Sequence, residues 1–144
     1  MTSPARYRSV RDSCRHGESG GGFLTNVASM AAYTPTPRMA VYGAAKAFVL
    51  SFTESLWAET RGTGVTVFAL SPGATAGARM RTPDDVVATA LTHLARRNPG
   101  PSVVDGPLNR VSAAAVRMLS RRATATVMHR VTDPARRKYA DLVR

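Results

Sequence analysis

The feature that most constrains this fold is a strand–helix–strand pattern between residues 23 and 70. Residues 23–28 (FLTNVA) form a short apolar run after a glycine cluster, and residues 65–70 (VTVFAL) form a β-branched run between a glycine and a proline. Short apolar runs between such breaks are typical of buried strands. Residues 40–61 lie between the runs and carry apolar side chains every three or four positions, which predicts a long helix. We therefore expect a βαβ unit with two parallel strands.

The long helix is preceded by a loop and has one apolar stripe. Pro35 and Pro37 exclude regular structure in residues 29–38, so we expect a loop there. The stripe consists of Val41, Ala45, Phe48, Phe52 and Leu56. Because side chains at this spacing line one helical face, that face is expected to pack against the core.

A second unit of the same kind follows. Thr82 precedes Pro83 and two aspartates, and a proline and acids in the first turn are helix start signals. This helix is expected to end near Ala95, and a short strand at residues 102–104 would complete the second unit. The sequence therefore predicts the α/β class: a partial Rossmann-like, doubly wound parallel sheet of about three strands with flanking helices.

The sheet region is flanked by two segments of different composition. Residues 1–21 are polar and show no clear period, so we interpret them as a poorly ordered leader. Residues 22–106 hold the sheet, and residues 107–144 form a basic helical tail that Asp133–Pro134 divides before a last short helix. The helical stripe of the tail consists of Leu108, Val111, Ala115 and Met118. A chain of 144 residues has room for one such domain.

Charge and cysteine content narrow the partners and the compartment. The formal net charge is +11, almost all from arginine, and a solvated arginine-rich surface is the simplest interpretation. A tail that binds nucleic acid or membrane is an alternative, but no nucleic-acid-binding motif accompanies it, so we expect neither partner. Its basic residues are Arg110, Arg117, Arg121, Arg122, Arg136 and Arg137. The single Cys14 cannot form an internal disulfide, and no apolar run reaches the roughly 20 residues of a membrane span, so a cytoplasmic protein is expected.

Three side chains could carry chemistry together. Tyr42 and Lys46 are four residues apart at the start of the long helix, and Ser29 follows the first strand, at the sheet edge where ligands bind. A free phenol has a pKa of about 10, and a nearby ammonium favours the phenolate, which makes the phenol a usable acid or base. A serine hydroxyl can donate a hydrogen bond to a substrate oxygen. Taken alone, the tyrosine and lysine also fit a surface aromatic packed on a lysine stem.

Three linked motifs resemble the short-chain dehydrogenase/reductase family. NVAS at residues 26–29, YGAAK at residues 42–46 and SPG at residues 71–73 follow the order and spacing of that family. The resemblance implies that Ser29 polarises the substrate oxygen and that Tyr42 is the catalytic acid/base. It implies that Lys46 assists Tyr42 and binds the nicotinamide ribose, and that the nicotinamide ring lies against Pro72, Gly73 and Thr75. By the same resemblance, the cofactor is NAD or NADP, the substrate is a small alcohol or carbonyl compound, and homo-oligomers are possible.

The resemblance is close over residues 22–73 and extends loosely over roughly residues 20–130, so residues 22–106 are interpreted as the catalytic half of the family's fold. The family's TGxxxGxG phosphate loop and NNAG motif have no counterpart here, and the glycines at residues 17–22 lack that spacing. We therefore expect that the cofactor-binding half is missing, that the choice between NAD and NADP is unreadable, and that the first strand exposes an edge. Gly77 replaces the family's usual threonine, which predicts a shortened substrate lid.

This leaves two functional hypotheses open. One is an NAD(P)-dependent oxidoreductase, and the other is an inactive fragment or pseudoenzyme that acts at most by associating with a partner through its long helix. Phe48, Phe52, Leu56 and Trp57 could serve that association, although core packing is the simpler role for them. Three histidines, His16, His93 and His129, lack metal-site spacing, so we expect no metal and interpret them as solvated.

Overall fold

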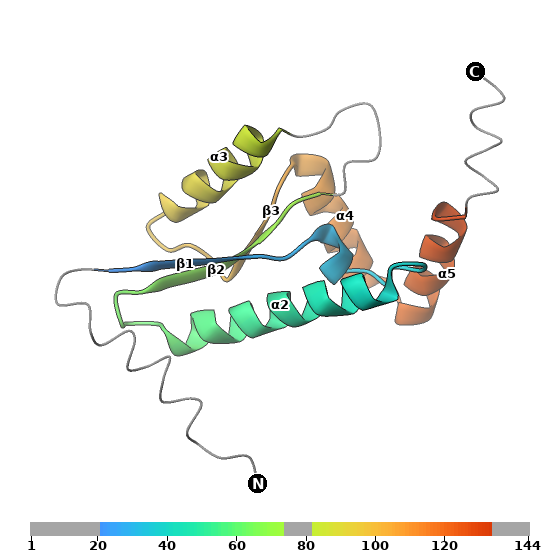
Figure 1. Ribbon diagram of the computed structural model, residues 1–144, viewed down its shortest axis with the longest axis horizontal. Helices are drawn as coiled ribbons and strands as arrows, with labels where there is room; N and C mark the ends of the chain where they lie inside the picture. Colours follow the sequence, from blue (N-terminus) through green and yellow to red (C-terminus); the bar gives the residue numbers. More distant parts are fainter. Residues whose placement is uncertain (1–20, 74–81, 134–144) are drawn as a thin grey trace, which may run out of the picture.

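The computed structural model describes residues 21–73 and 82–133, which form a three-stranded parallel sheet with helices around it (Figure 1). The strand order is β1-β2-β3, and both neighbouring pairs are parallel. The elements are β1 (Phe23–Val27), the 3-10 turn η1 (Met30–Ala32), α2 (Ala40–Glu59), β2 (Thr66–Ser71), α3 (Pro83–Leu94), β3 (Ser102–Val104), α4 (Pro107–Met118) and α5 (Arg121–Val131). The predicted α/β class and both βαβ units are confirmed.

The sheet is covered by α2 on one face and by α3 on the other (Figure 1). Facing α2, Ala69 of β2 packs with Ala28 and Leu50. The opposite face packs against α3 through a cluster of Phe68, Leu70 and Val103, with Val86, Ala90 and Leu94 of the helix against it. Apolar residues of β2 thus alternate between two cores, which is why this strand reads as a continuous apolar run.

The start of α3 follows the predicted signals. The Thr82 hydroxyl accepts a hydrogen bond from Asp85 N at 3.2 Å, and the Asp85 carboxylate accepts one from Thr82 N at 3.0 Å. This reciprocal pair satisfies backbone donors that the first helical turn leaves without partners. Pro83 occupies the first turn, where a missing N–H costs nothing.

The expectation that the stripe of α2 packs against the core is wrong for four of its five residues. Phe48 is 67% exposed, and Val41, Ala45 and Phe52 are exposed as well; only Leu56 is buried. The core face of α2 is instead formed by Gly43, Leu50, Thr53 and Leu56. Apolar residues occupy more than one face of this helix, so their spacing alone did not identify the face that meets the sheet. Trp57 is half-buried, and its ring N–H donates to Pro99 O at 3.0 Å.

The first strand is present where the sequence predicts it, but it is not buried. Phe23 is 70% exposed, and Leu24 and Val27 are exposed too. Only β2 pairs with β1, so the other edge of β1 has no strand partner among residues 21–73 and 82–133. The expectation that this strand exposes an edge and apolar side chains is therefore confirmed.

The basic tail contains two helices within residues 107–131. Leu119 and Ser120 separate α4 from α5, and the Ser120 hydroxyl caps α5 by accepting from Ala123 N at 3.2 Å. The predicted stripe of α4 is exposed, and Ala113 is the buried residue of that helix. Arg38 donates to Thr132 O and lies 3.8 Å from the Asp133 carboxylate, so the end of α5 is held against the loop before α2. The predicted last helix after Pro134 and the leader lie outside the described residues.

The interpretation of His93 as a solvated histidine is wrong. The side chain is 3% exposed and its ring lies 5.0 Å from that of Phe68. Its Nε2 lies 3.0 Å from Gly100 O. His93 falls one position before Leu94 on α3, and this places it at the border of the apolar face that meets the sheet.

Candidate active site

Ser29 lies at the carboxyl end of β1, where it is nearly buried. Its Oγ caps η1 by accepting a hydrogen bond from Ala31 N at 3.2 Å. The next residue, Met30, donates its N–H to Pro72 O at 3.1 Å. Because parallel strands end at the same edge of a sheet, the turn after β2 meets the turn after β1 here. The serine and the predicted nicotinamide-contacting turn are therefore neighbours.

Lys46 joins the start of α2 to the same edge. Its Nζ donates to Val27 O at 2.8 Å, two residues before Ser29. The same nitrogen lies 5.8 Å from the centre of the Tyr42 ring, one helical turn earlier. Tyr42 is 46% exposed, so its ring is open to a ligand. One ammonium thus contacts both the strand that ends at Ser29 and the phenol of Tyr42.

Gly43, between Tyr42 and Lys46, allows the loop after Ser29 to cross the helix closely. A Cβ at this position would collide with Thr36 Oγ1 and lie 3.6 Å from Ala31 O. A larger residue would displace the Thr36 side chain of this loop. The glycine of the YGAAK motif therefore helps to set the separation between Ser29 and Tyr42.

Two polar contacts at this edge were not predicted from the sequence. The Tyr33 hydroxyl lies 3.5 Å from Ser71 Oγ, and Asn26 Nδ2 donates to Thr53 Oγ1 at 3.0 Å. Asn26 belongs to a recognised motif, but nothing in the spacing indicates that its partner is a buried threonine 27 residues later. Tyr33 lies in a loop, where no helical or strand periodicity predicts the direction of its side chain.

Most of the predicted site residues gather at one edge of the sheet. Lys46 lies between Tyr42 and the end of β1, and Pro72 contacts the residue after Ser29. Gly73 lies so close to Asn109 of α4 that a Cβ would collide with the Asn109 side chain. Thr75 and Gly77 lie outside the described residues.

A groove of about 590 Å³ runs beside this edge, between the loop after β1, the start of α2 and the α4–α5 pair. Its lining includes Ala31, Tyr33, Gly43, Ala44 and Leu119, so it borders the neighbours of Ser29 and Tyr42. Apolar side chains dominate it, which suits a small organic molecule. Within the described part of the chain, no three metal-ligating side chains gather in one place, and no helix has the length and apolar character to cross a bilayer.

A family model for short chain dehydrogenases matches residues 8–85, more than half of the chain. The chain belongs to this family. The matched range begins within the segment interpreted above as a leader, so family likeness extends closer to the N-terminus than the three motifs do. The boundaries of the three predicted segments remain predictions.

Relatives of known sequence and structure agree with this assignment. A short chain dehydrogenase of Pseudocercospora fijiensis is 41% identical over 76 residues, which are 53% of this chain and 24% of that protein. The structure of a 7beta-hydroxysteroid dehydrogenase is 26% identical with a TM-score of 0.68, covering 87% of this chain and 51% of that one. A short chain dehydrogenase from Burkholderia cenocepacia in complex with NADP has the same fold, with 24% identity and a TM-score of 0.63 over 86% of this chain and 56% of that one. The chain thus spans about half the length of the solved dehydrogenases that it matches.

Proposed function

We propose that this short-chain dehydrogenase carries the proton-handling site for NAD(P)-dependent hydride transfer between an alcohol and a carbonyl compound. Ser29, Tyr42 and Lys46 are the catalytic residues in this proposal. The observation that supports it most directly is the position of Lys46, whose ammonium contacts both Val27 O and the Tyr42 ring. A surface lysine packed on an aromatic ring would not need the strand carbonyl.

Ser29 is suited to donate a hydrogen bond to the substrate oxygen. Its Oγ already accepts from Ala31 N, so the hydroxyl hydrogen remains to be directed elsewhere. A fixed donor of this kind stabilises negative charge as it develops on a carbonyl oxygen. The backbone contact also holds the hydroxyl in place before substrate arrives.

Tyr42 is the proton donor when a carbonyl is reduced and the acceptor when an alcohol is oxidised. The Lys46 ammonium lies 5.8 Å from the centre of the Tyr42 ring. Lys46 has three N–H donors, and Val27 O accepts one of them. The other two can bind the phenolic oxygen and a sugar hydroxyl.

The residues present fit the nicotinamide end of the cofactor. The spare donors of Lys46 suit a ribose, and the turn at Pro72 and Gly73 lies against the residue that follows Ser29. When bound, the nicotinamide would supply or accept the hydride, since no side chain can do so. The relative from Burkholderia cenocepacia was solved with NADP, so NADP and NAD both belong in the test.

A second candidate function is association with a partner by a catalytically inactive chain. The exposed apolar residues of β1 and α2, among them Phe23 and Phe48, favour it. Phe48 and Phe52 are stacked with ring centres 5.7 Å apart, which makes a continuous aromatic surface. Large exposed apolar surfaces often mark sites of association.

The catalytic proposal is tested by replacing the three side chains. We expect the full chain to bind NADPH or NADH and to oxidise it with members of a panel of aldehydes and ketones. Tyr42→Phe should lower kcat/KM by roughly 10²–10⁴-fold because it removes the acid/base. Ser29→Ala should lower kcat/KM by roughly 10²-fold because one donor to the oxyanion is lost. Cofactor fluorescence and absorbance report binding and turnover.

Ser55→Ala is the matched control for these variants. Ser55 is exposed on α2, and its hydroxyl donates to Ser51 O within the same helix. The Ser55→Ala variant should be as active as the original chain. Equal activity in Tyr42→Phe would contradict the assigned roles, and absence of both cofactor binding and turnover would leave association as the better proposal.

A further inference from the structure

A second groove, of about 430 Å³, lies between α3, β3 and α4. It is lined by Tyr33, His93, Arg96, Ser102, Val103, Val104, Arg110, Ala113, Ala114 and Arg117. Three guanidinium side chains therefore meet around one hollow, and none of the described lining residues is acidic. This concentration of positive charge favours an anionic ligand.

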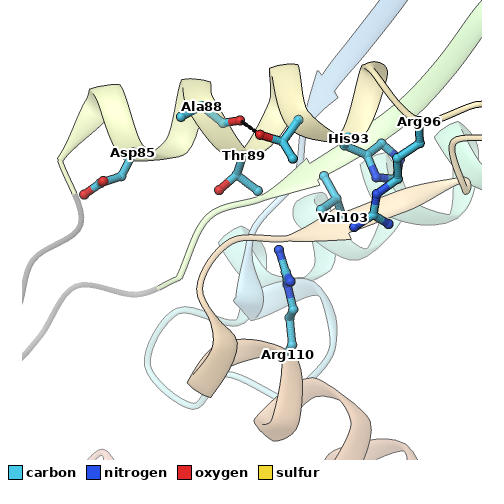
Figure 2. Close-up of a pocket in the computed structure, with 8 residues that line it drawn as sticks. Asp85, Ala88, Thr89, His93, Arg96, Val103 and Arg110 are labelled. Carbon is cyan, nitrogen blue, oxygen red and sulfur yellow. Dashed lines mark hydrogen bonds between the residues drawn. The ribbon is translucent and has the colours of Figure 1, made fainter.

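Arg96 lies two residues after the end of α3, and Arg110 and Arg117 belong to α4. Figure 2, which draws the adjoining smaller hollow, shows Arg96 after α3 and Arg110 of α4 extending toward β3 from opposite sides, with the His93 ring beside Arg96. Arg110 is fixed in place because its Nε donates to Val104 O at 2.9 Å. Arg117 is held over the Tyr33 ring, with 5.7 Å between its Cζ and the ring centre. Two of the three guanidinium groups are thus held before any ligand binds, which lowers the entropic cost of binding.

His93 provides an independent indication of a missing partner. Its Nε2 must donate to Gly100 O, because a carbonyl oxygen only accepts. The other ring nitrogen, Nδ1, is buried and has no hydrogen-bond partner. Leaving a buried polar atom unsatisfied is unfavourable. With Nε2 as the donor, Nδ1 is an acceptor, and the P–OH group of a phosphate in the groove that His93 lines can donate to it.

None of the three neighbouring acidic side chains lines the larger groove. Ser102 donates its hydroxyl to the Glu54 carboxylate at 3.0 Å, and Asp105 accepts from the Thr89 hydroxyl at 2.7 Å. Asp85 lines a smaller hollow of about 170 Å³ that shares His93, Arg96 and Arg110. The larger groove, which includes Arg117 and not Asp85, is therefore the more positive of the two.

We propose that this groove binds a small tetrahedral oxyanion, a phosphate or sulfate group. Arg96, Arg110 and Arg117 supply planar, permanently charged donors, which match the oxygens of such a group. His93 adds an acceptor, Nδ1, for a hydroxyl of the phosphate. This site is distinct from Ser29, Tyr42 and Lys46, and binding there does not require the chain to transfer hydride.

The test is a titration of the full chain with inorganic phosphate at constant ionic strength, followed by calorimetry. We expect saturable binding of one phosphate per chain, competition by sulfate, and roughly tenfold weaker binding of acetate, whose planar group offers fewer oxygens. Arg96→Gln should weaken phosphate binding by roughly tenfold. Arg110→Lys keeps the positive charge but loses the planar guanidinium with its paired N–H donors, and should weaken phosphate binding by a smaller factor.

Arg130→Gln is the matched control, because Arg130 is exposed on α5 and lines none of these hollows. It should leave phosphate affinity within about twofold. If Arg96→Gln and Arg130→Gln weaken phosphate binding equally, or if acetate binds as tightly as phosphate, the proposal is wrong. Either result would indicate non-specific attraction of anions to a basic chain. Nitrogen NMR gives a second readout: phosphate should change the His93 Nδ1 chemical shift as this nitrogen gains a hydrogen-bond partner, and an unchanged shift would contradict its role.

Discussion

Neighbouring strands β1 and β2 are aligned residue by residue, yet their burial is opposite. Five of the six residues of β2 are buried, whereas four of the five residues of β1 are exposed. In the middle of the sheet, β2 has strands on both sides and helices on both faces, while β1 has one strand partner. The difference shows that an apolar run predicts a strand, and that the elements around the strand decide its burial.

The exposed strand is nevertheless well anchored at one end. At its carboxyl end, Ala28 N donates to Leu70 O at 2.8 Å, and Val27 O accepts from Lys46. Asn26 is tied to Thr53 of α2. These contacts lie at the edge where Ser29 is found, so the end of β1 that carries the candidate site is also the end that the rest of the domain holds.

Replacement of one phenylalanine in each strand should give the largest difference. Phe68→Ala in β2 removes a fully buried ring from the α3 core, and should lower the free energy of unfolding by about 3–5 kcal/mol. Phe23→Ala in β1 removes a ring that is mostly exposed, and should change it by less than about 0.5 kcal/mol. Urea unfolding followed by circular dichroism measures both.

A large loss of unfolding free energy in Phe23→Ala would contradict the contrast in burial between β1 and β2. It would mean that another surface covers β1 in solution, and the loss should then depend on protein concentration. A loss that is independent of concentration would instead indicate that the chain itself covers β1.

The sequence predicted the elements of the fold well because each has local signals. Thr82, Pro83 and Asp85 set the start of α3, and the short strand β3 was predicted with its observed bounds. The orientation of α2 was not predictable in the same way, because apolar residues occupy more than one of its faces. The break at Leu119 and Ser120 was missed because the basic tail has no proline or glycine there to indicate it.

The sequence allows the candidate site residues to be named, but it does not give their contacts. Motif spacing placed Ser29, Tyr42 and Lys46 at one sheet edge, and this follows from parallel topology. The hydrogen bond from Lys46 to Val27 O and the burial of His93 depend on how α2 and α3 pack onto the sheet. The hydrogen bond has no signal in the order of residues, whereas His93 lies three residues after Ala90, near the apolar face of α3.

A double-mutant cycle on Asn26 and Thr53 should show how strongly the anchored end of β1 is tied to α2. Asn26→Ala and Thr53→Val each remove one side of the hydrogen bond, and the coupling between them should be about 1 kcal/mol. Urea unfolding of the two single variants and the double variant measures it. Additive losses would show that this hydrogen bond contributes nothing, and that backbone pairing and the contact of Lys46 with Val27 O hold this end.

The smallest effect is expected on the outward face of α2, where Phe48 lies across the helix from the core. Phe48→Ala should change the free energy of unfolding by less than about 0.5 kcal/mol, because the ring is mostly exposed and contacts chiefly Phe52. Val41→Ala, on the same stripe and also exposed, is the matched control. If Phe48→Ala loses stability while Val41→Ala does not, another surface covers the aromatic pair in solution. That surface would lie on the side of α2 that faces away from β2.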